Sequence, residues 1–199
     1  MEQFLKELAS KEPTPGGGGA SALLGSVSAA LCSMVANLTT GKKKYAQYQE
    51  DIERILKEME TGIWKIHSFI EKDAIAFAPL AQAYSIPKDQ PDREQILEKA
   101  LLDAAVLPME LTETLYALVP VMEELEIKGS RLAISDVAVA AAACEGALKG
   151  AVMNVYINTR LMKDKEKANA MNQKAMELEE DGSRRCREVY VRIRQSLLL

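Results

Sequence analysis

Proline and glycine crowd into one stretch near the start of the chain, where the sequence runs Pro13-Thr-Pro-Gly-Gly-Gly-Gly19. Proline fixes φ and glycine frees it, so this backbone can turn sharply and come close to a ligand. The twenty uncharged residues 20–39 that follow are expected to form a helix, whose first free N–H groups favour an anionic or electron-rich partner. A flexible linker is the other interpretation, but linkers seldom lead directly into a buried helix. We therefore predict a binding loop.

Asp73 is the first candidate for proton transfer. It follows Ile66 and Ile70 and precedes Phe77 at the three-to-four-residue spacing of one helix face, so it lies on or beside an apolar stripe. A carboxylate in that position is partly desolvated, which raises its pKa and lets it exchange protons near neutral pH. Pairing with a lysine or capping a neighbouring helix would explain the same position without catalysis.

Asp136 and two asparagines are the other polar candidates. Asp136 stands just before the apolar run 138–143, where it could point into a cleft, or where it or Ser135 could simply cap a helix. Asn154 and Asn158 lie one turn apart on one helix face. Two such amides could hydrogen-bond a flat ligand or bridge helices in the core, and the sequence favours neither over the other.

Other catalytic classes find no support in the sequence. His67 is the only histidine, and Glu71, four residues on, makes a surface pair a better interpretation than a metal site. The cysteines lack the spacing of zinc ligands, and no serine has the surroundings of a nucleophile elbow. The glycine run lacks the Gly-Lys-Ser/Thr of a Walker loop and follows no strand. Carboxylates and amides remain as the catalytic groups, with no metal expected.

The composition is that of an ordinary globular domain. The 199 residues are 48% hydrophobic and 27% charged with a net charge of −4, which fits a single domain over 1–199 and gives no support for nucleic-acid binding. Three widely spaced cysteines, an odd number, indicate reduced thiols and a cytoplasmic protein, and the start of the chain has no apolar signal segment. Residues 20–39 could span a membrane by length, but their serines and missing aromatic belt favour a buried helix.

Helical periodicity runs through the whole sequence, with almost no strand-like alternation. Prolines 79, 108 and 120 should each kink or interrupt a helix. The pattern predicts an all-α protein, an antiparallel bundle of about six helices, several of them long. Their expected ranges are 2–10, 19–40, 44–84, 92–127, 131–163 and 164–197.

Taken in order, these residues resemble the cyclodeaminase/cyclohydrolase family of folate enzymes, which includes the C-terminal domain of formiminotransferase-cyclodeaminase and stand-alone methenyltetrahydrofolate cyclohydrolases. The resemblance runs from about residue 4 to residue 160. Its motifs are Pro13-Thr-Pro-Gly-Gly-Gly18, Ser33-Met-Val-Ala36 with Leu38-Thr39, Gly41-Lys42 with Lys44-Tyr45, Asp73 with Ala76-Phe77, Ser135-Asp136, and Asn154-Val155 with Ile157-Asn158.

The resemblance implies an all-helical homodimer that binds a tetrahydrofolate derivative near the proline–glycine loop and acts on the carbon between N5 and N10. It implies neither a metal nor a redox cofactor. A negatively charged, polyglutamylated folate tail would suit the lysines at 42–44. The residues so implicated are Asp73 and Asp136 as catalytic groups, and Pro15, Gly16, Gly17, Gly18, Lys42, Tyr45, Asn154 and Asn158 as substrate-binding groups.

Three positions depart from the family pattern. Gly19 stands where serine is usual, Ala138 where glycine is common, and Ser130 where asparagine is frequent. The expected activity is methenyltetrahydrofolate cyclohydrolase or formimidoyltetrahydrofolate cyclodeaminase, and a chain without a formiminotransferase domain slightly favours the first. The alternatives are a folate-binding bundle without catalysis and a helical scaffold without a small-molecule site.

Overall fold

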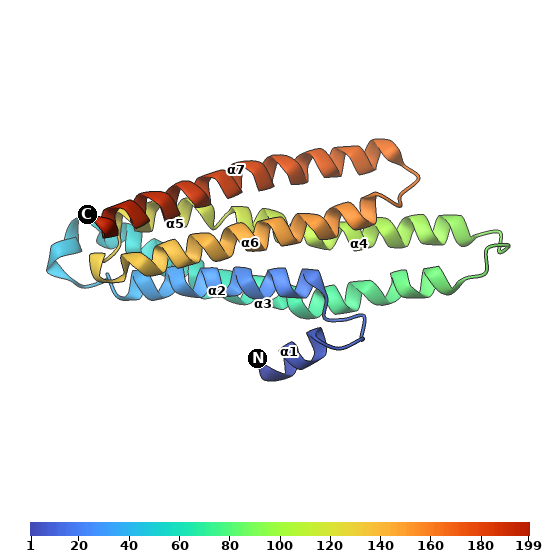
Figure 1. Ribbon diagram of the computed structural model, residues 1–199, viewed down its shortest axis with the longest axis horizontal. Coiled ribbons are helices and arrows are strands. Elements are labelled where there is room, and N and C mark those ends of the chain that lie inside the picture. The colour runs from blue at the N-terminus through green and yellow to red at the C-terminus, as the bar shows by residue number, and fades with distance from the viewer.

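The computed structural model describes residues 1–199 as a bundle of helices joined by short loops, with no strand (Figure 1). This confirms the predicted all-α bundle, and its longest helices lie side by side along one axis. The elements are α1 (Glu2–Leu8), α2 (Gly17–Asn37), the 3-10 helix η1 (Lys43–Tyr48), α3 (Gln49–Ser85), α4 (Arg93–Tyr116), α5 (Val119–Lys128), the 3-10 turn η2 (Arg131–Ala133), α6 (Ile134–Thr159) and α7 (Lys165–Leu198).

One expected helix proves to be two. The range 92–127 divides into α4 and α5 at Ala117–Leu118, and Pro120 lies in the first turn of α5. A proline has no N–H to donate, and a helix start is where that donor is not needed. Pro79 and Pro108, by contrast, lie inside α3 and α4. The expected starts at 44 and 131 are also too early for α-helix, because both segments begin with 3-10 turns.

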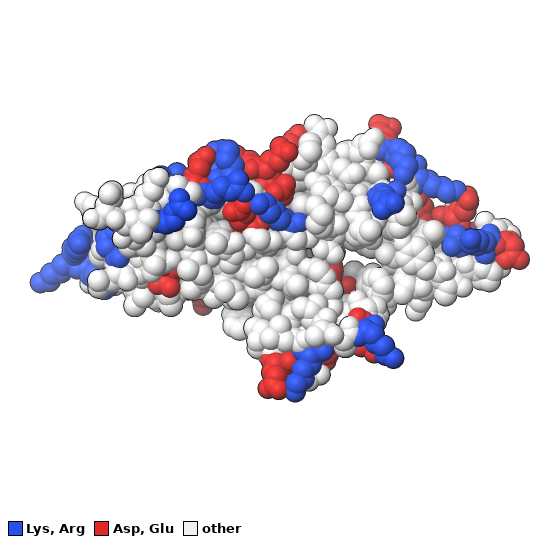
Figure 2. All heavy atoms as spheres, in the orientation of Figure 1, with Lys and Arg blue, Asp and Glu red and all other residues white.

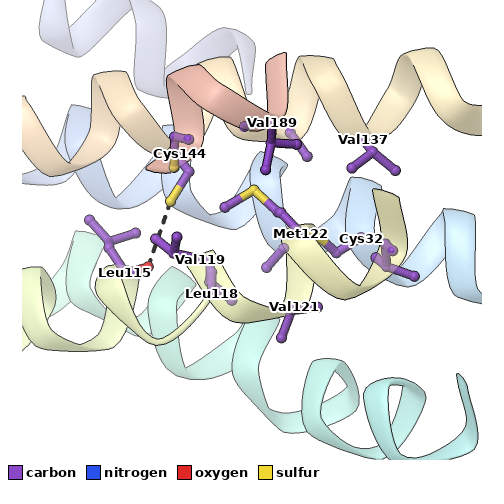
Figure 3. Close-up of a cluster of buried hydrophobic side chains, with 14 of the residues drawn as sticks. Cys32, Leu115, Leu118, Val119, Val121, Met122, Val137, Cys144 and Val189 are labelled. Atoms are coloured by element: carbon purple, nitrogen blue, oxygen red, sulfur yellow. Dashed lines mark hydrogen bonds between the residues drawn. The ribbon is translucent and has the colours of Figure 1, made fainter. Parts of the chain in front are cut away.

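The main core fills the space between α2, α3, α4, α5, α6 and α7. Figure 3 shows part of it, where Cys144 of α6 donates a weak Sγ–H bond of 3.6 Å to the carbonyl of Leu115. Leu115 and Met122 are fully buried there. Burying one such side chain contributes about 1.5–3 kcal/mol, so the apolar stripes of the long helices supply most of the stabilisation.

Small residues let α2 and α6 approach closely at Gly150. A Cβ at Gly150 would overlap the hydroxyl of Ser21 in α2. Further along, the Ser28 hydroxyl donates to the carbonyl oxygen of Ala140 at 2.8 Å. The two helices run antiparallel, so the start of α2 lies beside the second half of α6 (Figure 1).

Two stretches, Gly17–Asn37 and Arg93–Lys128, are long and apolar enough to cross a membrane by length and composition. In both, 56% of the apolar window is buried inside the bundle, as in the core helix of a soluble protein. The short helix α1 differs from the others, since it has no buried residue and projects beside the start of α2 (Figure 1).

Candidate active site

Asp73 caps the first turn of α2 from the neighbouring helix α3. Gly16, the N-cap residue of α2, offers no side chain to its free N–H groups. The carboxylate of Asp73 fills that role, because the Gly19 N–H donates to its Oδ2 at 3.0 Å. An anion is favoured at this end of a helix, since the unpaired N–H groups carry partial positive charge. The capping alternative raised for Asp73 is therefore present in the structure.

The carboxylate can reach this position only because the facing residue is glycine. A Cβ at Gly18 would lie 2.6 Å from Cγ and 2.7 Å from Oδ2 of Asp73, closer than such atoms pack. The glycines of the loop thus permit a close approach between the backbone of α2 and a side chain of α3. Pro15 lies against the same turn, 3.4 Å from where a Cβ at Gly19 would stand.

The surroundings of Asp73 favour its protonated form. Partial burial raises the pKa of this carboxyl above its ordinary value of 3.8, and the hydrogen bond from the Gly19 N–H offsets part of that rise. No lysine or arginine contributes to the pKa, so the lysine-pairing alternative finds no partner in the structure. A half-buried carboxyl without a countercation is suited to taking up and returning a proton.

Asp73 opens into a cavity of about 360 Å³ formed by the loop before α2 together with α3, α4 and α6. A space of this size is in the range of small-molecule sites. The lining is Pro13, Thr14, Gly16, Gly17, Asp73, Ala76, Phe77, Leu80, Tyr84, Ala104, Leu107, Pro108, Asn154, Ile157, Asn158 and Leu161.

Asn158 is fixed in this cavity by a proline in α4. Pro108 has no N–H, so the carbonyl of Ala104, four residues earlier, lacks its helical partner. The Asn158 Nδ2 donates to that carbonyl at 3.0 Å and to the Asn154 carbonyl at 2.9 Å. Asn158 therefore bridges α6 to α4, and its side chain also lines the cavity.

Asn154 faces the glycine loop directly. Its Nδ2 donates to the carbonyl of Gly150 at 2.9 Å, and its amide would lie 3.4 Å from a Cβ at Gly17. With both Nδ2 groups engaged by the backbone, the Oδ1 atoms of Asn154 and Asn158 are the parts of the amides left to accept hydrogen bonds from a ligand. Asn158 thus bridges two helices and Asn154 does not, and both amides line the cavity, so their contact with a ligand stays a prediction.

Three other predicted site residues lie at the far end of the bundle. Lys42 donates to the Ser130 hydroxyl at 3.3 Å, and the Tyr45 hydroxyl accepts from the Arg131 N–H at 2.9 Å. Asp136 is in the first turn of α6. Since α2 has 21 residues, this end is about 30 Å from Gly17 along the helix axis. Within one chain, Lys42, Tyr45 and Asp136 do not join the cavity of Asp73.

The structure adds residues that the sequence did not single out as site residues. Tyr84, Leu107 and Leu161 line the cavity, and an isolated apolar residue on a helix gives no sign of that. His67 is exposed and packs edge-on against Trp64 with ring centres 5.8 Å apart, instead of pairing with Glu71. No group of three or more histidine, cysteine, aspartate or glutamate side chains is arranged to hold a metal ion.

An all-helical bundle in which a proline–glycine loop, a half-buried aspartate and two asparagines meet at one cavity has the features of a small-molecule enzyme that transfers protons. The chain belongs to the formiminotransferase-cyclodeaminase family, whose family model matches residues 1–177.

Named relatives and a solved structure agree with this assignment. The methenyltetrahydrofolate cyclohydrolase of Methylorubrum extorquens is 36% identical over 169 residues, which cover 83% of this chain and 81% of that protein. The formimidoyltransferase-cyclodeaminase of Mus musculus is 33% identical over 82% of this chain, which spans only 31% of that longer protein. A formiminotetrahydrofolate cyclodeaminase from Thermotoga maritima superimposes with a TM-score of 0.83 at 29% identity, over 98% of this chain and 93% of that one.

Proposed function

We propose that this protein is a one-carbon folate enzyme that acts on the carbon between N5 and N10 of tetrahydrofolate, with methenyltetrahydrofolate cyclohydrolase as its first activity. The observation that carries the proposal is Asp73, a half-buried carboxyl without a cationic partner at the wall of a ligand-sized cavity. The cyclohydrolase from M. extorquens, which this chain matches over most of its length, supports the choice of reaction.

In cyclohydrolysis, water adds to the methenyl carbon, and the C–N5 bond of the tetrahedral adduct then breaks to leave the formyl group on N10. Asp73 takes a proton from the attacking water and returns one to the departing N5. Such proton transfer is worth about 10²–10⁴ in rate. The Oδ1 atoms of Asn154 and Asn158 are acceptors for the N–H groups of the pterin, and Phe77 offers an apolar wall for its ring.

Cyclodeamination is the second candidate, supported by the solved relative from T. maritima. There N10 attacks the formimino carbon on N5 and ammonia leaves. The same carboxyl serves both reactions, because each needs one group that accepts a proton from the nucleophile and gives one to the leaving nitrogen. Neither reaction requires a metal or a redox cofactor, and we propose that the enzyme uses none.

Incubating the purified protein with methenyltetrahydrofolate and with formimidoyltetrahydrofolate, while following the methenyl absorbance, separates the two activities. Loss of absorbance with the first folate is the expected result. A gain of absorbance with the second would assign the deaminase. Folate binding, seen as a raised melting temperature, without turnover of either compound would contradict the enzymatic proposal and favour a binding protein. No thermal shift would favour a scaffold.

The cellular location, the oligomeric state and the partners of the enzyme are proposed on separate grounds. The three cysteines are free and buried, which supports a reducing, cytoplasmic location. We also propose a homodimer, since α2 and α6 expose apolar side chains at the surface, and a folate substrate that is extended by a glutamate tail. We expect neither nucleic acid nor a membrane among the partners.

A further inference from the structure

The two amides of the cavity are held so that their oxygens stay open. The Asn158 Nδ2 donates to two backbone carbonyls, at 3.0 Å to Ala104 and at 2.9 Å to Asn154, which uses both of its hydrogens. The Asn154 Nδ2 donates to the Gly150 carbonyl at 2.9 Å. Neither Oδ1 accepts a bond from the protein, and no buried side-chain oxygen lacks a partner, so both oxygens are open to the cavity.

The orientation of the Asn158 amide depends on Pro108. In a regular helix the Ala104 carbonyl accepts the N–H of residue 108, and that bond would compete with the amide for the same oxygen. Proline has no N–H, so the carbonyl is free to take a hydrogen from α6. A flipped amide would turn its oxygen toward two carbonyl oxygens, which cannot donate. The amide is therefore satisfied only with Oδ1 toward the cavity.

The cavity as a whole is rich in acceptors. Its lining contains no lysine, arginine or histidine, and Asp73 is its only charged residue. Figure 2 shows the surface hollowed beside the loop that joins α1 to α2, with mostly uncharged atoms around the hollow. Asp73 belongs to α3 and both asparagines belong to α6, and these helices face each other because α2 and α4 each pack against both. A ligand that fits must present N–H groups to α6.

A reduced pterin carries N–H groups that match these two oxygens. Its N8–H and its 2-amino group stand on one long edge of the ring, on either side of N1, and both donate. Residues one helical turn apart hold their Cβ atoms about 5–6 Å apart, close to the spacing of those two donors. In an oxidised pterin N8 has a lone pair in place of the hydrogen, so an amide oxygen there would stay unpaired.

The position of Asp73 decides which amide meets which donor. A Cβ at Gly18 would overlap Asp73 and one at Gly17 would lie 3.4 Å from Asn154, so the carboxylate and this amide lie at the same level of the cavity. Asn158 is one turn further along α6. N5 and N8 stand opposite each other in one ring of the pterin. With N5 toward Asp73, the N8–H therefore meets Asn154 and the 2-amino group meets Asn158.

We infer that Pro108 is a positioning residue, which turns the Oδ1 of Asn158 toward the 2-amino group of a reduced pterin through the free carbonyl of Ala104. The Oδ1 of Asn154 accepts from the N8–H of the same ring. The inference rests on the proposed function for its ligand, and on the hydrogen bonds of the two amides for its geometry. Oxidised folates fail to pair with Asn154 and are bound weakly, although their tail and its charge are the same.

Three ligands test the recognition of each N–H group. 7,8-Dihydrofolate carries both donors, folic acid lacks the N8–H, and 2-desamino-2-methyl-7,8-dihydrofolate lacks the amino group. In titration calorimetry the wild-type protein should bind 7,8-dihydrofolate about tenfold or more tightly than either of the others, because each of those leaves one amide oxygen unpaired. Equal affinity for all three ligands overturns the inference.

Pro108→Ala should separate the two preferences. Its new N–H competes for the Ala104 carbonyl and frees the Asn158 amide to turn, so the preference for the 2-amino group should fall to about threefold or less while the preference for N8–H persists. Asn158→Leu should abolish the same preference, and it keeps the test decisive if Pro108→Ala does not fold. Both preferences intact in Pro108→Ala, or affinity lowered equally for all three ligands, would contradict the positioning role.

Pro79→Ala in α3 is the matched control and should keep both preferences. Pro79 also lies inside a helix, but the carbonyl that it leaves free, on the exposed Ile75, takes no hydrogen bond from a side chain.

Exchange of side-chain amide hydrogens, followed by NMR, tests the orientation without a ligand. The Asn158 hydrogens should exchange more slowly than those of the exposed Asn37, which also donates to the carbonyl four residues earlier. In Pro108→Ala they should exchange about tenfold faster or more, while Asn37 stays unchanged. Equal exchange at Asn158 in both proteins overturns the role of Pro108 whichever ligand binds. If the wild type binds neither 7,8-dihydrofolate nor tetrahydrofolate, the proposed function fails, and if it binds tetrahydrofolate without any preference among the three ligands, only the inference fails.

Discussion

At the scale of single residues, the chemistry depends on Asp73. Asp73→Asn should leave the bundle and folate binding intact but lower turnover by about a hundredfold or more, because an amide cannot accept and return the proton. The substitution is nearly isosteric, and an amide oxygen can still accept from the Gly19 N–H. Steady-state kinetics with a folate-binding titration measure the effect. Asp136→Asn is the comparison, and a greater loss there would move the catalytic role to Asp136.

The pH dependence of stability gives a second prediction for the same residue. Because burial raises the folded-state pKa of Asp73 above 3.8, the folded protein binds a proton at pH values where the unfolded chain does not. The stabilisation from this proton is full below the unfolded-state pKa and is lost as the pH rises through the folded-state value. The stability of wild type relative to Asp73→Asn should therefore increase on acidification from pH 7 toward pH 4.

Urea unfolding of both proteins over this pH range measures that difference. The Asn variant is the internal reference, since it lacks the titrating group and shares every other carboxyl. A difference in unfolding free energy that stays constant, or that moves in favour of Asn at low pH, would contradict the burial of Asp73.

At the scale of elements, the close contact between α2 and α3 is what places the carboxyl. Gly18→Ala should displace Asp73, because the new methyl group would overlap the carboxylate, and turnover should fall by about the same hundredfold as in Asp73→Asn. The matched control is Gly62→Ala within α3, where a Cβ meets only the Met59 methyl at 3.7 Å. That change should keep activity and stabilise the protein by about 0.5–1 kcal/mol. Unchanged turnover in Gly18→Ala would show that the close approach is not needed.

The elements themselves follow from the sequence to a large extent. Apolar spacing predicts the long helices, and Gly41, with a φ of 71°, ends a turn where a break is expected. The apolar spacing does not predict how each proline affects its helix. Pro120 starts a helix, whereas Pro108 stays inside one and leaves the Ala104 carbonyl free for Asn158. Whether a buried proline starts a helix or lies inside one depends on a hydrogen-bond donor from another helix, because the carbonyl that the proline leaves free needs a partner. Helix packing decides whether such a donor is present.

At the scale of the whole molecule, the sequence predicts which residues belong to a site better than it predicts where they meet. Asp73, Gly17 and Asn158 come together although they are far apart along the chain, and the ordered motifs named all three. The same motifs named Lys42, which lies at the opposite end of α2. Helical rise alone separates these groups, so a single chain cannot bring them together.

The three core thiols connect folding to function in a last prediction. Cys32, Cys144 and Cys186 are all buried, and burial raises the pKa of Cys32 to about 12, so none should react with a thiol reagent until the bundle opens. If opening is global and reclosing is fast, the labelling rate follows the population of the unfolded state. A reduced folate at about a hundred times its Kd should slow labelling about a hundredfold, because it stabilises only the folded state.

A Lys57→Cys variant, with its new thiol exposed on α3, is the control and should label that thiol at the same rate with or without folate. Fast labelling of the native cysteines would contradict the buried core. A labelling rate that folate leaves unchanged would contradict the folate site. The exposed thiol shows whether folate affects the reagent itself.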